Sequence, residues 1–305
     1  MYFNNKNSFL HGINFHHFHD DKKHLAGQGS INKDDFNSII KFIGRENILD
    51  AGEFCNRVKE KKLDDRKVCL TFDDGIKSQI DVALPVLEDY KIKSFFFVYS
   101  SLFEGNPDLL EVYRFFRLNY FKSVDEFYVD FFKELNEPQI EIFLDKRKDA
   151  IQAIKKKSPY YSINDIKFRQ VRDYFLSKER YKKIMESMFV TKGFKAEKHY
   201  SNLFFNKDDL VTLNSLGNLI GLHSHTHPTS LENLDVNSQK NEYQKNQFII
   251  SKVLNIEPER IKSMSHPCGS YNKKTLEALE EMGIEIGFKH LMDIETERGM
   301  RKINI

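Results

Sequence analysis

The chain has 305 residues, of which 40% are hydrophobic, so it is long enough to bury the core of one large α/β domain. Its 47 basic and 45 acidic residues give a net charge of +2, which is too balanced for a nucleic-acid-binding protein. Residues 1–15 lack a secretory signal pattern and no stretch approaches the roughly 18 apolar residues of a membrane span, so we expect a cytoplasmic protein without a membrane span.

Strand-like and helix-like patterns alternate along the chain. In its first part, the sequence predicts a strand at 13–18, a helix capped by Asn32, a strand at 68–72, a helix over 78–90 and a strand at 94–98. In its last part, it predicts a helix that is capped by Asn206 and ends before Gly217, and then a strand at 219–222. A helix from the cap Asp235 to about residue 254 follows, and then a strand at 261–265. The last two predicted elements are a helix over 273–282 and a strand at 284–288. This order favours a parallel sheet, open or closed into a barrel, with its chemistry at the carboxyl ends of the strands.

One stretch breaks this alternation. Residues 105–200 are mostly helical in pattern and rich in Lys, Phe and Tyr. The lysine-rich runs at 155–157 and 178–183 are typical of solvated helix faces rather than of binding patches. We therefore predict a single domain over residues 1–305 that carries an inserted helical subdomain at 105–200.

The first candidate site is the sequence TFDDG at 71–75, which comes directly after the strand predicted at 68–72. Two adjacent carboxylates repel each other, so each needs a compensating partner, and a divalent cation is one such partner. One Asp could then bind the metal while the other stays free as a base. The alternative is a simple turn, because Asp-Gly is a common turn dipeptide.

The second candidate site is the sequence HSHTHP at 223–228, directly after the strand predicted at 219–222. Three histidines at alternate positions would project to one side of an extended chain, whereas His223 and His227 would share a face of a helical turn. Either geometry lets two imidazoles converge on one ion. The alternative is a solvated loop or ordinary core histidines, which the presence of a carboxylate motif at another strand end disfavours.

One Asp and two His together would form a nitrogen–oxygen site with open coordination positions. That ligand set suits zinc, and also iron, cobalt or nickel. The three cysteines are widely spaced, which argues against a cysteine-type zinc site. An open position would let the ion bind water, lower its pKa and polarise a carbonyl.

The motifs resemble those of a known family. TFDDG at 71–75 resembles the first motif of the polysaccharide deacetylases, the NodB-homology family similar to carbohydrate esterase family 4. HSHTH at 223–227 resembles their H-[ST]-x-x-H motif, and HPCGSYN at 266–272 looks like their third motif. The resemblance covers most of the chain outside 105–200. It implies a distorted (β/α) barrel and removal of acetyl groups from sugars, usually from nitrogen.

The resemblance also implies roles for individual residues. Asp73 matches the general base, and Asp74, His223 and His227 match the ligands of one divalent metal ion, expected to be zinc, with iron, cobalt or nickel as alternatives. His225 falls at a variable position, so we expect it to be a loop residue or to support the ligands from behind.

The third motif both fits the family and departs from it. In the family, the backbone N–H before the motif's glycine stabilises the oxyanion; here the glycine is Gly269 and that N–H belongs to Cys268. Family members often have an Arg at the start of the motif, near the base, whereas this chain has Ser265. Arg301 is a candidate substitute, with a surface salt bridge as the alternative.

The proton donor is the other departure. The late motif that usually supplies a catalytic His is not visible, and the flanking residues of His290 do not fit it. Phe15-His16 resembles the Tyr-His found early in a circularly permuted branch of the family, in which an N-terminal His takes the place of the acid. Strand residues alternate in direction, so His16 and His17 cannot both face the site, and the match selects His16. The alternative is a surface strand end or an adventitious metal site.

The predicted function is hydrolysis of the amide of an N-acetylated sugar for a surface polysaccharide or glycoconjugate, with a nucleotide- or lipid-linked sugar as the expected substrate. Two alternatives stay open: an O-deacetylase or deformylase using the same site, and a sugar-binding protein with a vestigial site. The missing arginine and the displaced acid favour the vestigial site. The retained set of Asp73, Asp74, His223 and His227 argues against it.

Overall fold

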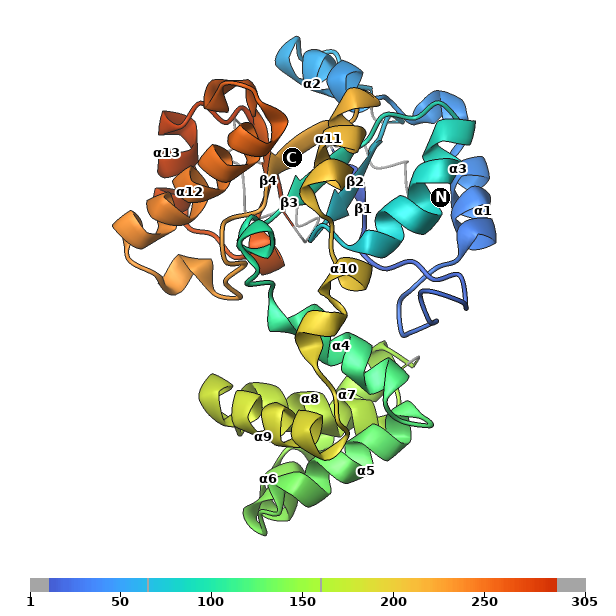
Figure 1. The fold of residues 1–305 in the computed structure, drawn as a ribbon, viewed down its shortest axis with the longest axis vertical. Helices are drawn as coiled ribbons and strands as arrows, with labels where there is room; N and C mark the ends of the chain where they lie inside the picture. The colour runs from blue at the N-terminus through green and yellow to red at the C-terminus, as the bar shows by residue number, and fades with distance from the viewer. Residues whose placement is uncertain (1–10, 65, 160, 290–305) are drawn as a thin grey trace. The chain divides into compact units, whose positions relative to one another are not determined.

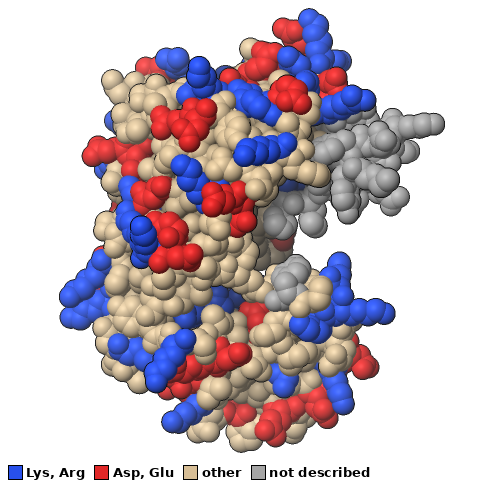
Figure 2. Space-filling view, turned by 90° about the vertical axis from the view of Figure 1, so that its right-hand side faces the viewer, with Lys and Arg blue, Asp and Glu red and all other residues tan. Residues whose placement is uncertain are grey.

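The computed structural model describes residues 11–64, 66–159 and 161–289. They fall into two compact units, one formed by the chain up to Asp108 and from Tyr200 onward, the other by Leu109–His199. Within the described ranges no helix has both the length and the apolar character needed to cross a membrane. Figure 2 shows basic and acidic side chains interspersed over the face it draws, as the balanced net charge leads one to expect.

The first unit is built on a sheet of six parallel strands that follow one another in sequence order and curl into a half-barrel (Figure 1). The strands are β1 (Gly12–Phe15), β2 (Cys69–Asp73), β3 (Phe95–Val98), β4 (Leu219–Leu222), β5 (Ser263–Ser265) and β6 (Ile286–Phe288). The predicted parallel strand–helix architecture is therefore confirmed. Its strands are short apolar runs because helices cover the outer face and side chains fill the inner one.

One face of the sheet carries both aromatic and polar side chains. Its aromatic cluster includes Phe95 and Phe97 of β3, stacked at a centroid distance of 5.7 Å, and Phe288 of β6, whose ring contacts both. Gly221 of β4 is required there, because a Cβ atom would lie 2.5 Å from the ring of Phe97. Since side chains alternate along a strand, Asp73 lies on the same face as Cys69 of this cluster, at the carboxyl end of β2.

The helices of the first unit connect the strands. They are α1 (Lys33–Ile43), α2 (Ala51–Lys59), α3 (Leu84–Asp89), α10 (Tyr200–Leu203), α11 (Lys207–Ser215), α12 (Val236–Leu254) and α13 (Lys273–Glu281). Helix α2 was not predicted. Its sequence is mostly polar and only Ala51 and Phe54 are buried, so it lacks a long apolar stripe.

Two predicted elements differ from their expected bounds by more than two residues. Strand β1 ends at Phe15, because the chain then turns Phe18 into the core and hydrogen-bonds it to Ser78. The helix predicted over 78–90 begins with a π-helical turn, Gln79–Ala83, before α3. Pro85 lies just inside α3 and has no N–H for the regular helical ladder, which accounts for the irregular start.

The second unit, inserted in the sequence between β3 and β4, is helical. It comprises α4 (Leu109–Asn119), α5 (Val124–Leu135), α6 (Gln139–Lys146), α7 (Lys148–Lys157), α8 (Ile163–Tyr174) and α9 (Lys178–Thr191). Its core is aromatic, with Phe127, Phe131 and Phe168 in mutual ring contact and fully buried. The high Phe and Tyr content of this stretch therefore supplies its own core.

Candidate active site

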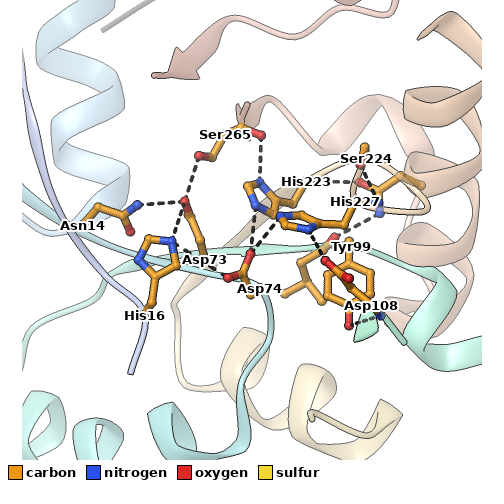
Figure 3. Close-up of polar contacts among 12 residues, drawn as sticks. Asn14, His16, Asp73, Asp74, Tyr99, Asp108, His223, Ser224, His227 and Ser265 are labelled. Carbon is orange, nitrogen blue, oxygen red and sulfur yellow. Dashed lines mark hydrogen bonds and ion pairs between the residues drawn. The ribbon is translucent and has the colours of Figure 1, made fainter. Parts of the chain in front are cut away.

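Three side chains converge where β2 and β4 end. The ligand atoms of Asp74, His223 and His227 all lie within 4.8 Å of one another (Figure 3). Oδ1 of Asp74 is 3.1 Å from Nε2 of His223 and 3.2 Å from Nε2 of His227. The two candidate motifs, far apart in the sequence, thus meet at one point of the sheet edge.

Unusual backbone conformations aim these side chains. Asp74, Ser224 and His227 have positive φ angles of 76°, 62° and 56°. Such conformations cost about 1–3 kcal/mol each for residues other than glycine and persist only where the surroundings enforce them. One such enforcing contact is local, since the N–H of His227 donates to Oγ of Ser224 at 3.1 Å.

The second nitrogen of each histidine is held by an acceptor. Nδ1 of His223 lies 2.9 Å from the carbonyl oxygen of Ser265, and Nδ1 of His227 lies 2.6 Å from Oδ2 of Asp108. A carbonyl oxygen can only accept, so Nδ1 of His223 carries the proton, and a carboxylate imposes the same tautomer on His227. Both Nε2 atoms then face Asp74, as in histidines that bind a metal through Nε2.

The charges also fit a bound cation. Burial alone would raise the pKa of Asp74, but the charge of His227 and hydrogen bonds from both histidines lower it well below its usual value. Burial alone would lower the pKa of His227, but the charge of Asp74 and the hydrogen bond to Asp108 raise it well above its usual value. A divalent ion bound here could supply the positive charge that the protonated imidazole of His227 otherwise supplies to Asp74. Ligands at about 2.0–2.1 Å from one ion lie about 3.0–3.4 Å apart, and the spacings of 3.1 and 3.2 Å match.

Asp73 is in a different environment from its neighbour. It is the last residue of β2 and only 4% exposed. Its Oδ2 accepts hydrogen bonds from Nδ2 of Asn14 at 2.8 Å and from Oγ of Ser265 at 3.1 Å. Its Oδ1 is buried and has no hydrogen-bond partner among the described residues. Because Asp73 directly precedes Asp74 in the chain, a second carboxylate lies beside the metal-ligand group.

His16 lies next to both carboxylates. Its Nε2 is 3.9 Å from Oδ2 of Asp73 and 3.9 Å from Oδ2 of Asp74. The side-chain amide of Gln79, in the π-helical turn, donates to the backbone oxygens of His16 at 3.0 Å and of Asp73 at 2.6 Å. This one amide fixes the ends of β1 and β2 relative to each other. The imidazole is about one-third exposed, so it could exchange protons with a bound substrate.

The middle histidine of the second motif has other partners. Nδ1 of His225 is 2.9 Å from Oγ of Ser100, and its Nε2 is 3.4 Å from Glu104. Helix α12 anchors the segment 223–227, which carries the three histidines. Glu242 of this helix accepts hydrogen bonds from the backbone N–H groups of residues 225 and 226. Asn246 accepts one from the backbone N–H of residue 223. His225 is thus turned to a separate polar cluster.

The third motif forms a short turn after β5. Cys268 is exposed and has a positive φ of 53° within the turn Pro267–Gly269. The N–H of Gly269 donates to the oxygen of His266 at 2.9 Å. The role of Cys268 at an oxyanion stays a prediction. At the position where the family often has an Arg, Ser265 instead contacts Asp73 through Oγ and His223 through its carbonyl.

Several contributors were not predicted from the sequence, and two candidates cannot be placed. Arg301 and His290 lie outside the described residues. Asp108 belongs to no motif and follows the end of β3 by ten positions, so no pattern in the sequence indicates it. For Asn14 the sequence offers only an indirect signal: it precedes His16 by two residues, and alternate residues of the strand predicted at 13–18 would share a face.

Comparison with known proteins agrees with the motifs. The sequence profile described as polysaccharide deacetylase matches residues 60–114 and 152–287, more than half of the chain. No curated protein sequence matches significantly. Among solved structures, the deacetylase PplD of Streptococcus pyogenes, determined in complex with acetate, is 15% identical, with a TM-score of 0.54 over 92% of this chain and 83% of that one.

Two further structures have the same architecture. A de-N-acetylase from Aggregatibacter actinomycetemcomitans is 13% identical, with a TM-score of 0.55 over 96% of this chain and 93% of that one. The deacetylase domain of BpsB from Bordetella bronchiseptica is 14% identical, with a TM-score of 0.51 over 92% and 88%. The predicted distorted (β/α) barrel of the NodB-homology type is therefore confirmed. The chain belongs to the polysaccharide deacetylase family.

Proposed function

We propose that this chain is a metal-dependent hydrolase that removes the acetyl group from the nitrogen of an N-acetylated sugar. One observation carries the proposal: a second, buried carboxylate, that of Asp73, adjoins a group of three metal-ligand side chains, Asp74, His223 and His227. That combination supplies a base beside a cation site, which is what hydrolysis of an acetyl group requires.

Each residue of the site would have a distinct role in the reaction. Asp74, His223 and His227 would hold the divalent ion, whose chemistry when bound is to polarise the acetyl carbonyl and to lower the pKa of water. Asp73 takes the proton of the attacking water, and the N–H of Cys268 donates to the developing oxyanion. Asp108 keeps the imidazole of His227 in the tautomer that binds through Nε2.

Acetyl removal from nitrogen, rather than from oxygen, is favoured by His16. An amine is a poor leaving group until its nitrogen is protonated, so an amide hydrolase needs a proton donor near the carboxylates. His16 lies 3.9 Å from both of them and is partly exposed. The Aggregatibacter protein of the same fold, whose name is de-N-acetylase, is a second support for the amide. Descent from a circularly permuted branch of the family stays a prediction.

Release of acetate, or of formate from N-formylated compounds, tests the proposal. The purified protein is incubated with N-acetylated amino-sugar oligosaccharides, with nucleotide- and lipid-linked N-acetylated sugars, and with O-acetylated and N-formylated analogues. The proposal expects turnover of an N-acetylated member of the panel and abolition of that turnover by a chelator. Preference for the O-acetyl or N-formyl compounds would favour the second activity left open by the sequence. Sugar binding without any turnover would indicate a vestigial site.

A further inference from the structure

The two carboxylate oxygens of Asp73 differ in their hydrogen bonding. Oδ2 accepts two hydrogen bonds, from the side-chain amide of Asn14 and from the hydroxyl of Ser265 (Figure 3). Oδ1 is buried and has no hydrogen-bond partner in the described part of the chain. Both donors therefore act on the same oxygen of the carboxylate.

The donors reach Asp73 from two different strands. Asn14 of β1 pairs with Thr71 of β2, and Asp73 follows Thr71 by two residues, so Asn14 and Asp73 lie on the same face of the sheet. Ser265 is the last residue of β5, further along the curled sheet. With Cβ fixed by the strand and Oδ2 fixed by two donors, rotation about the Cβ–Cγ bond is blocked. The direction of Oδ1 is then set as well.

We infer that Asn14 and Ser265 are positioning residues: by holding Oδ2 of Asp73 they keep its carboxylate in the orientation in which it accepts the proton from water. The inference rests on the proposed function. An O–H bond of the water breaks, its proton passes to the carboxylate of Asp73, and the water oxygen bonds to the acetyl carbon. When the C–N bond breaks, the electron pair stays on nitrogen, which takes up a proton from His16, and acetate leaves.

The two donors, Asn14 and Ser265, can be substituted without changing the side chains of the metal-ligand group. Asn14 is exposed at the edge strand, so Asn14→Ala should fold normally. Ser265→Ala removes only the hydroxyl and keeps the carbonyl oxygen that holds His223. Neither change removes an atom of the three ligand side chains. Loss of either donor lets the carboxylate rotate, so that it keeps the orientation needed for proton transfer for only part of the time.

The test compares the wild type, Asn14→Ala and Ser265→Ala with the matched controls Asn37→Ala and Ser215→Ala, whose side chains make only short-range hydrogen bonds on helix surfaces. For an N-acetylated substrate we expect kcat to fall roughly 10- to 100-fold in each test variant, as for loss of a hydrogen bond to a charged group. KM, bound metal and Tm should stay at the wild-type values, and the controls should retain full turnover.

The outcomes separate this inference from the function on which it rests. A wild type that hydrolyses the substrate, together with test variants of normal kcat, would overturn the positioning role and leave the deacetylase function standing. Loss of bound metal or a large drop of Tm in both test variants would assign the two residues a structural role instead. A wild type without turnover on any N-acetylated substrate would overturn the proposed function, and the inference with it.

Discussion

Asp73 and Asp74 are identical neighbours with different surroundings, and the difference comes from one backbone angle. Asp73 ends a strand in extended conformation, whereas Asp74 has a positive φ of 76° and swings its carboxylate toward the histidines. The sequence predicted that both would lie at a strand end. It could not assign the base and the ligand by itself, because that assignment depends on a local angle; the family resemblance supplied it.

Asparagine at position 73 separates proton transfer from metal binding. Asp73→Asn preserves the shape of the side chain but removes the base, so we expect bound metal to be retained and turnover to fall on the order of 100-fold or more. Metal analysis and steady-state kinetics on the same preparation measure both quantities. Near-normal turnover would remove Asp73 from the mechanism.

Alanine at position 16 tests the proton donor. His16→Ala should keep the metal and the fold but lose turnover on amides, while losing much less on activated esters, whose leaving groups need no proton. Kinetics on a matched amide and ester pair give the comparison. Equal losses on both substrates, or loss of metal, would make His16 a ligand or a structural residue.

Asparagine at position 108 tests the support of the metal site. Asp108→Asn replaces a charged acceptor of the His227 Nδ1 proton, so metal affinity should fall about 10- to 100-fold, as for other outer partners of ligating histidines. Competition with a chromophoric chelator measures the affinity without any substrate. Asp34→Asn, on the exposed first turn of α1, is the control. Unchanged affinity of the Asp108 variant would show that the contact does not tune the site.

At the scale of elements, local hydrogen bonding made several helix starts predictable. Asn32, Asn206 and Asp235 were predicted as caps, and each side chain accepts from a backbone N–H of the following first turn. Contacts between elements were not predictable in this way. Asn14 meets Asp73 across 59 positions and Asp108 meets His227 across 119, and neither pairing leaves a local pattern.

Helix α12 ties two strands to the site, which leads to a prediction about stability. The side chain of Asn246, fully buried, accepts from the N–H of His223 and donates to the oxygen of Val98 at the end of β3. Asn246→Ala leaves both backbone groups without these partners, so we expect the free energy of unfolding to fall by about 2–4 kcal/mol. Denaturant unfolding of the metal-free protein measures it. A change below about 0.5 kcal/mol, the size of an ordinary surface substitution, would contradict the bridging role.

At the scale of the whole molecule, parallel topology explains how distant segments build one site. Every strand of the described sheet runs in the same direction, so the carboxyl ends meet at one edge. There Asp74 and His223, 149 positions apart, come within 3.1 Å, and Ser265 reaches Asp73 across 192 positions. The sequence predicted this convergence from strand ends alone, because the rule depends on topology and not on side-chain detail.

The central claim is that one divalent ion, held by Asp74, His223 and His227, is required for deacetylation. The most direct measurement is the metal content per chain of the wild type, His223→Ala, His227→Ala and the control His225→Ala, paired with acetate release before and after chelation. We expect one ion per chain in the wild type and in His225→Ala, loss of the ion in the other two variants, and activity that chelation abolishes and added metal restores. Full occupancy in both His223→Ala and His227→Ala, or acetate release that survives complete removal of the metal, would contradict the claim.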